Sequence, residues 1–235
     1  PAAPASFLAE ALGRPRTLTI AYSAENPSNT PLHPDVAAGF AATIAKLEEL
    51  GHKVIERPIQ TDWRKLYRAQ GAHSAGHFGA GVIQSIAEVG REPEPGDFEP
   101  LTMTYWEGSR RFPADKAAFG TLTMRAMCRD IIAQFDQFDV FLSPTMITPP
   151  PEIGLIDTVN LDSKELNRRQ AKVFGYTPPW NMTGQPSISL PLAWSEDGLP
   201  IGMMFTGRYA DEATLLNLAI QLEQAMPWAS RRPVH

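Results

Sequence analysis

Cysteine is almost absent from this sequence, which contains one, Cys128, among 235 residues. A single thiol cannot form a disulfide within the chain, and so low a cysteine content fits a reducing compartment. The sequence also lacks any apolar run near the ~20 residues needed to span a bilayer, and its first residues do not have a signal-peptide layout. We therefore expect a cytoplasmic protein that has no membrane association.

Positive charge is in deficit as well, because 26 acidic residues outnumber 21 basic ones and the formal net charge is −5. Proteins that bind nucleic acid present a basic face to the phosphate backbone, so this balance argues against a nucleic-acid partner. The apolar share of 43% is enough for a buried core. On length alone, the chain is one large domain or two small ones.

Several motifs that carry chemistry are missing. The sequence contains no G-x-S-x-G nucleophile elbow and no G-x-x-x-x-G-K-[ST] phosphate-binding loop. The glycines of GHFGAG, residues 76–81, have the wrong spacing for a dinucleotide-binding loop and follow no predicted strand. Motifs alone therefore assign no enzyme class.

Two histidines and the single cysteine are candidate reactive groups. His73 and His77 are four residues apart and would share a helix face, where two imidazoles can bind zinc. The segment reads HSAGH, without the glutamate of H-E-x-x-H or a third ligand, so a polar surface patch is favoured over a metal site. Cys128 lies in a predicted apolar helix, where an inert buried thiol is favoured, although Arg125 and Arg129 are near in sequence.

The first part of the chain has the pattern of a strand, a helix and a second strand. Residues 18–22 (LTIAY) and 54–56 read as strands, and residues 34–47 have apolar side chains at helical spacing. Pro34 suits the start of this helix and Gly51 suits its end. We predict that the two strands are parallel.

The remaining pattern indicates an α/β fold. About five short strands are separated by helices, and strands that are apolar on both sides favour a mixed sheet covered by helices on both faces. The chain begins with an Ala/Pro-rich leading segment, residues 1–15, followed by the strand-helix-strand unit. We then expect two helices within 61–87, broken near 71–81, helices at 99–110 and 114–136, and a strand at 140–143. A Pro-rich loop follows, then a partly helical segment at 160–174, strands at 187–192 and 200–207, and a helix from near 211 to 227.

Three passages resemble the amidase signature family, whose members are serine hydrolases that cut amide bonds. They are residues 16–56, which begin RTLTIAYSAENPSNT, residues 138–154 (FDVFLSPTMITPPPEIG), and residues 174–228, which begin FGYTPPWNMTGQPSISLPLAW. The loop ITPPPEIG and the passage GLPIG are similar to the branch that includes 6-aminohexanoate cyclic dimer hydrolase. The resemblance implies that residues 1–235 are the C-terminal half of an amidase signature domain.

The same resemblance implies that the catalytic residues are absent. In this family a lysine takes the proton, one serine relays it and a second serine in a Gly/Ser-rich segment attacks the amide carbonyl, all in the N-terminal half. This sequence has no Gly-Ser-Ser run and no lysine in a matching motif, so we assign no catalytic residue. We expect no metal and no cofactor, a small-molecule amide as the substrate, and an isolated chain that is inactive.

Five residues are predicted to contribute to substrate binding from their place in the resemblance: Trp106, Thr145, Met146, Phe174 and Asn181. Residues 143–146 follow a strand, and ligands gather at the carboxyl ends of strands in open α/β sheets; an ordinary exit from strand to loop is the alternative. Trp106 could instead cover a core. Asn181 could instead bond the backbone of its own loop.

A second hypothesis comes from a different class of protein. The chain could be a non-catalytic subunit or scaffold that binds a partner through an exposed sheet edge, because unpaired edge strands recruit other chains. Apolar faces left bare by a missing half would also favour association into a homo-oligomer.

Overall fold

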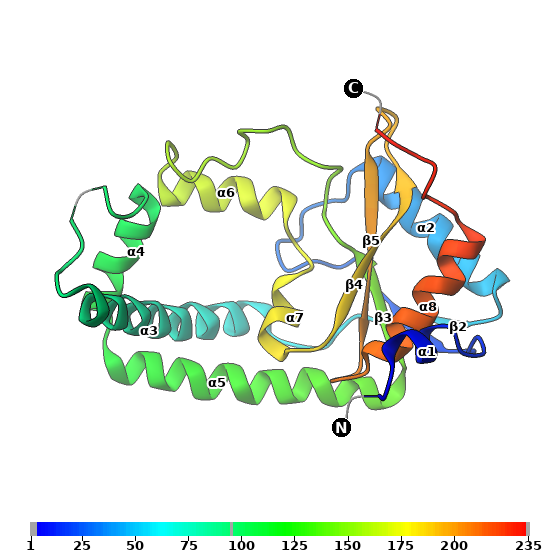
Figure 1. Ribbon diagram of the computed structural model, residues 1–235, viewed down its shortest axis with the longest axis horizontal. Helices are drawn as coiled ribbons and strands as arrows, with labels where there is room; N and C mark the ends of the chain where they lie inside the picture. Colours follow the sequence, from blue (N-terminus) through cyan, green and yellow to red (C-terminus); the bar gives the residue numbers. More distant parts are fainter. Residues whose placement is uncertain (1–3, 95, 234–235) are drawn as a thin grey trace. The chain divides into compact units, whose positions relative to one another are not determined.

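The computed structural model describes residues 4–94 and 96–233. These residues form two compact units, each assembled from separate stretches of sequence (Figure 1). The first unit takes described residues from 1–60, 130–152 and 171–235, and the second unit takes those from 61–129 and 153–170. None of the helices in the described residues has the length and apolar character that crossing a membrane requires.

The first unit is built on a mixed five-stranded sheet in the order β2-β1-β3-β5-β4. Its strands are β1 (Thr19–Tyr22), β2 (Lys53–Glu56), β3 (Val140–Pro144), β4 (Ser187–Trp194) and β5 (Pro200–Gly207). β1 is parallel to β2 and to β3, whereas β5 is antiparallel to both of its neighbours. The predicted α/β fold and its parallel strand pair are confirmed.

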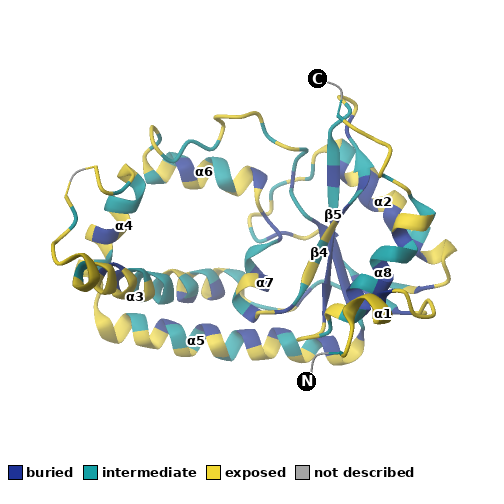
Figure 2. Cartoon of the chain, viewed as in Figure 1, coloured by how far each residue is buried: buried dark blue, intermediate teal, exposed yellow. Residues whose placement is uncertain are grey.

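One face of the sheet is covered by α2 (Pro34–Glu49) and α8 (Glu212–Ala225), whose buried residues join the apolar side chains of the strands in a single core (Figure 2). Gly39 sets how closely α2 approaches β4, since a Cβ there would lie 2.3 Å from the Cβ of Ala193. Asp211 caps α8 through Thr214, at the predicted start of that helix. The short helix α1 (Phe7–Ala11), within the predicted leading segment, is tied to α8 by the Asn217 amide, which donates to the Ala11 carbonyl at 3.1 Å.

The opposite face of the sheet is covered by smaller elements that include α7 (Pro178–Thr183) and the 3₁₀ turn η1 (Gln134–Gln137). Trp180 of α7 lies with its ring centroid 5.6 Å from that of Phe141 on β3 and 5.9 Å from that of Phe135 on η1. The sequence analysis expected a loop around Asn181, but Pro178 occupies the first turn of α7 and Gly184 ends this helix with a φ of 72°.

The second unit consists mainly of helices: α3 (Trp63–Val89), α4 (Pro100–Arg111), most of α5 (Ala114–Ala133) and most of α6 (Ser163–Val173). The predicted break near residues 71–81 is wrong, because α3 continues through them for 27 residues. The glycines serve packing instead. A Cβ at Gly76 would lie 2.9 Å from the Cβ of Ala117 on α5, and a Cβ at Gly79 would lie 2.9 Å from Oγ of Ser109 on α4.

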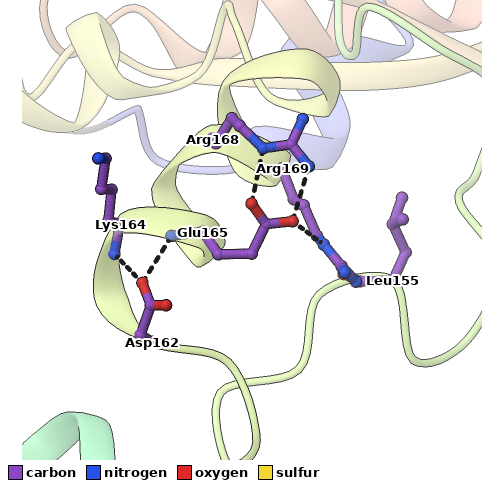
Figure 3. A network of polar contacts seen from close by, with 6 residues as sticks. All are labelled: Leu155, Asp162, Lys164, Glu165, Arg168 and Arg169. Carbon is purple, nitrogen blue, oxygen red and sulfur yellow. Dashed lines mark hydrogen bonds and ion pairs between the residues drawn. The ribbon is translucent and has the colours of Figure 1, made fainter.

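A carboxylate network orders the first turn of α6 (Figure 3). Asp162 Oδ1 accepts from the backbone N–H groups of Lys164 and Glu165, both at 2.9 Å. The Glu165 carboxylate accepts from the guanidinium groups of Arg168 and Arg169, and these bonds hold the pKa of Glu165 down at about 2. Arg169 also donates to the Leu155 carbonyl at 3.1 Å, which fastens the preceding loop to the helix.

Candidate functional site

Hydroxyl groups gather where β3 ends, on the face of the sheet opposite α2 and α8. Thr145 Oγ1 and Ser189 Oγ lie 2.6 Å apart and share a hydrogen bond, and the Thr145 backbone N–H donates to the Gly202 carbonyl at 3.0 Å. Gly202 makes room for this pair, since a Cβ there would lie 2.5 Å from Ser189 Oγ. The strand register puts Ser143 and Ser189 on opposite sides of Met204, so the three side chains share this face.

Ser143 is the buried member of this hydroxyl group. Its Oγ has no hydrogen-bond partner among the described residues, although its side chain is almost fully covered. A buried hydroxyl without a partner costs free energy, and such groups in native proteins usually meet a partner from a ligand, water or another chain. The Ser143 hydroxyl is therefore able to make a hydrogen bond on this face of the sheet.

Met146 and Phe174 are brought to the same place by backbone pairing. The N–H of Ile147 donates to the Val173 carbonyl at 2.9 Å, so the segment after β3 runs beside the end of α6. Gly175 allows the close approach, because a Cβ there would lie 2.9 Å from Cδ1 of Ile147. Phe174 is 41% exposed and Met146 is half-buried, so both present apolar surface beyond the end of β3.

Asn181 lies on the exposed side of α7, not in a loop. Its backbone N–H donates to the Thr177 carbonyl at 3.5 Å, as part of the helix. Neighbouring Trp180 fixes the helix against β3. Tyr176 fixes the preceding segment: its hydroxyl donates to the Ala24 carbonyl at 2.7 Å, and burial raises the pKa of that hydroxyl. The side chain of Asn181 thus projects from a well-anchored element.

Trp106 belongs to the second unit, whereas the other four predicted residues belong to the first. It lies on α4 and is only 5% exposed. The Arg110 guanidinium lies 5.3 Å from the centroid of its ring. Within its own unit, Trp106 is therefore a core residue, and its burial favours the covering role over the wall of a pocket.

The two histidines share a helix face as the spacing predicts. Their ring centroids are 3.9 Å apart, His73 Nδ1 lies 3.0 Å from Thr121 Oγ1, and His77 Nδ1 lies 3.1 Å from the His73 carbonyl. Burial, followed by the neighbouring charges of His77 and Arg125, lowers the pKa of His73. In residues 4–94 and 96–233, no cluster of three histidine, cysteine or acidic side chains could hold a metal ion.

The environment of Cys128 agrees with the prediction of an inert, buried thiol. Cys128 is buried on α5, and burial raises the pKa of its thiol. A thiol that stays protonated is a poor nucleophile, despite the two arginines near it in sequence.

The hydroxyl groups at the end of β3 have no hydrogen-bonded base within the described part of the chain. Among the described residues, no lysine or histidine nitrogen is hydrogen-bonded to Thr145, Ser189 or Ser143. A serine or threonine hydroxyl is a weak nucleophile unless a general base takes its proton. The described residues at this place can therefore donate hydrogen bonds to a polar ligand and accept them from it, and they supply no hydrogen-bonded base to activate these hydroxyls.

Sequence reasoning missed Ser189 and Gly202. The alternation in SISLPL put Ser187 and Ser189 on one face of a predicted strand, which was the available signal. What could not be foreseen is that β5 inserts between β3 and β4, which brings Thr145 and Ser189 together across 44 residues of sequence.

Comparison with known proteins identifies the family to which this chain belongs. The sequence profile of the family described as Amidase matches residues 1–216. A putative amidase AmiB2 of Mycobacterium tuberculosis is 34% identical over 239 residues, which cover 97% of this chain and 47% of that protein. The 6-aminohexanoate-cyclic-dimer hydrolase of Paenarthrobacter ureafaciens is 30% identical over 237 residues, which cover 93% of this chain and 46% of that protein.

The fold agrees with the sequence match. A solved structure of 6-aminohexanoate cyclic dimer hydrolase complexed with substrate superposes with a TM-score of 0.83 and 26% identity, over 99% of this chain and 50% of that one. An α/β unit with a mixed sheet is thus shared with enzymes that hydrolyse amides. The chain belongs to the amidase family, and it spans about half the length of the curated relatives it matches.

Proposed function

We propose that this chain is the C-terminal half of an amidase that hydrolyses carbon–nitrogen amide bonds through a Ser-Ser-Lys acyl-enzyme mechanism. The observation that carries the proposal is that nearly the whole chain matches only about half of an amide hydrolase. The lysine and both serines would come from the other half. By itself, the chain would be inactive on amides, because among the described residues no lysine or histidine is hydrogen-bonded to the hydroxyls at the end of β3.

In the whole enzyme, this chain would form part of the wall of the substrate site. Thr145, Met146, Phe174 and Asn181 belong to one unit, three of them in segments joined by the backbone pairing of Ile147 with Val173. Their mixture of apolar surface and a few polar groups is typical of small-molecule sites. We propose that these four residues contact the substrate, and that Trp106 contributes only through the packing of α4.

The substrate would be a small-molecule amide. One structural relative is described as a hydrolase of the 6-aminohexanoate cyclic dimer, which makes a cyclic amide the first compound to assay. Apolar contacts from Met146 and Phe174 would suit a methylene chain, and the Thr145–Ser189 hydroxyl pair could donate to or accept from an amide group.

The test compares the 235-residue chain with a longer protein in which this chain follows the N-terminal half of an amidase. Both are assayed for release of free amine from the 6-aminohexanoate cyclic dimer and from a simple aryl amide. We expect the background rate from the 235-residue chain, and hydrolysis by the longer protein that a serine-directed inhibitor abolishes. Inhibitor-sensitive hydrolysis by the 235-residue chain would contradict the proposal, and so would a longer protein that hydrolyses neither compound.

The sheet edge favours a second candidate, a non-catalytic subunit that binds a partner. β4 is an edge strand, paired only with β5 among the described residues, and edge strands can pair with another chain. Pro191 lies at the register shift between Leu190 and Ala193, a position where proline is tolerated and where it limits further pairing. A strictly monomeric chain in size-exclusion chromatography coupled to light scattering would exclude a homo-oligomer formed through this edge.

A further inference from the structure

The second unit has a groove between α3 and the start of α5, none of whose lining residues is among the five predicted to contact the amide substrate. Its volume is about 550 Å³. The floor consists of small residues, because a Cβ added at Gly120 would lie 2.6 Å from the Cβ of Ala72 and 2.9 Å from the carbonyl oxygen of Ala69. The two helices therefore touch along the floor, where Figure 1 shows them side by side, and the larger side chains around them form the walls.

The walls are strongly basic in a chain whose net charge is −5. Four cationic side chains line the groove: Arg64, Lys65, Arg68 and Lys116. The only carboxylate in the lining is that of Asp62, whose Oδ1 accepts from the Lys65 backbone N–H at 2.9 Å.

None of the four cations belongs to an ion pair of the described residues. Elsewhere in the same unit, Arg168 and Arg169 both pair with Glu165. The groove thus has four cations against the single carboxylate of Asp62 in its lining, and such a concavity attracts anions.

Two aromatic side chains complete the lining. Phe112 is 37% exposed and Phe119 is 69% exposed, so both leave apolar surface open to a ligand. A ligand that carried only charge would leave these rings in water. A purely apolar ligand would leave four cations without partners. The lining therefore complements a molecule that has both an anionic and an apolar part.

We propose that this groove binds a small organic anion with an aromatic or similar apolar group, such as an aryl carboxylate. The guanidinium and ammonium groups of Arg68 and Lys116 would contact the carboxylate, and Phe119 would pack against the ring. The volume lies within the range of ordinary small-molecule sites, roughly 300 to 1,000 Å³. The proposal goes beyond amide hydrolysis and does not depend on it, since all of the lining residues belong to the second unit.

The test is a set of NMR titrations of the 235-residue chain with three probes that separate charge from apolar surface. Benzoate has both, inorganic phosphate has charge alone, and benzyl alcohol has the ring alone. We expect benzoate to shift the signals of Ala69, Ala72 and Gly120 with a Kd of about 1 mM, and each of the other probes to bind at least about tenfold more weakly. Benzoate that leaves these signals unmoved, or phosphate that binds as tightly as benzoate, would overturn the proposal.

Substitutions then locate the site. Arg68→Gln with Lys116→Gln should weaken benzoate binding at least about tenfold, and Phe119→Ala alone should weaken it about threefold. The matched control is Lys164→Gln with Lys172→Gln on α6, which removes the same charge from exposed lysines outside the groove and should leave the Kd unchanged. Circular dichroism of each variant verifies folding. Equal weakening by the control pair would show a general charge effect and overturn the proposal.

Discussion

His52 is held in its neutral form by its surroundings. Its Nδ1 accepts from the backbone N–H of Leu18 at 3.2 Å, so the proton must be on Nε2, which is buried and has no partner among the described residues. A second proton would have to go on Nδ1, where the new N–H would point at the N–H of Leu18 and the hydrogen bond would be lost. Burial adds to this and lowers the pKa of His52 from 6.5.

This arrangement predicts a pH dependence of stability. The unfolded chain binds a proton at His52 near pH 6.5, whereas the folded chain does so only at lower pH. The stabilisation is therefore complete above pH 6.5 and is lost as the pH falls below it, by up to about 1.4 kcal/mol per pH unit. His52→Asn keeps an acceptor for Leu18 without a titrating group. Urea unfolding at about pH 7.5 and about pH 5.5 should show that the wild type loses stability relative to this variant, and an unchanged difference would contradict the assignment.

Single residues were predictable where a local signal existed. Thr145 and Met146 were predicted from their place in the resemblance and from their position after a predicted strand, and the structure places them at the carboxyl end of β3. Ser189 had only its alternation in the strand, and its contact with Thr145 depends on strand order. Asn181 was placed in a loop through the resemblance, whereas its proline and glycine neighbours here begin and end a short helix.

At the scale of elements, α3 shows how glycine can mislead. Four glycines between residues 71 and 81 predicted a break, since glycine weakens an isolated helix. None of them has a positive φ, and two of them lie where α4 and α5 pass too closely for a side chain. Tertiary packing therefore outweighs helix propensity, and sequence alone carries no information about which neighbours come close.

The glycines of α3 give a matched pair of substitutions. A Cβ added at Gly71 would meet no atom of a neighbouring element within 4 Å, so Gly71→Ala should raise the free energy of unfolding by about 0.5 to 1 kcal/mol through helix propensity alone. Gly76→Ala gains the same propensity but brings its Cβ to 2.9 Å from that of Ala117, so a net loss of about 1 to 2 kcal/mol is expected. Urea denaturation followed by circular dichroism measures both. Equal stabilisation by the two substitutions would show that Gly76 is not a packing residue.

For the molecule as a whole, the sequence predicted the class of fold better than the division of the chain. Periodicity located all five strands, and β5 begins and ends where the pattern GLPIGMMFTG predicts. The two units were not predicted, because the second joins residues 61–129 to residues 153–170 across a strand that belongs to the first. Only long-range contacts define such a boundary, and no composition change in the sequence marks it.

The two units should differ in local stability. In the first unit, β3 is buried along its whole length, and β5 is buried at six of its eight positions. In the second unit, α3 buries only Leu66, Ala69, Gly79 and Val82 among its 27 residues, and Ile83 and Val89 are 61% and 68% exposed. Regions with few buried apolar contacts open at lower free energy than the core.

Native-state hydrogen exchange measures this difference directly. We expect the amides of α3 to exchange through openings that cost at least about 2 kcal/mol less than those exposing β3 and β5. Gly71→Ala should slow exchange in α3 and leave the sheet unchanged, since its effect is confined to the helix. Uniform protection across α3 and the sheet would mean that the two units unfold together. It would contradict the prediction that the few buried residues of α3 leave this helix less stable than the sheet.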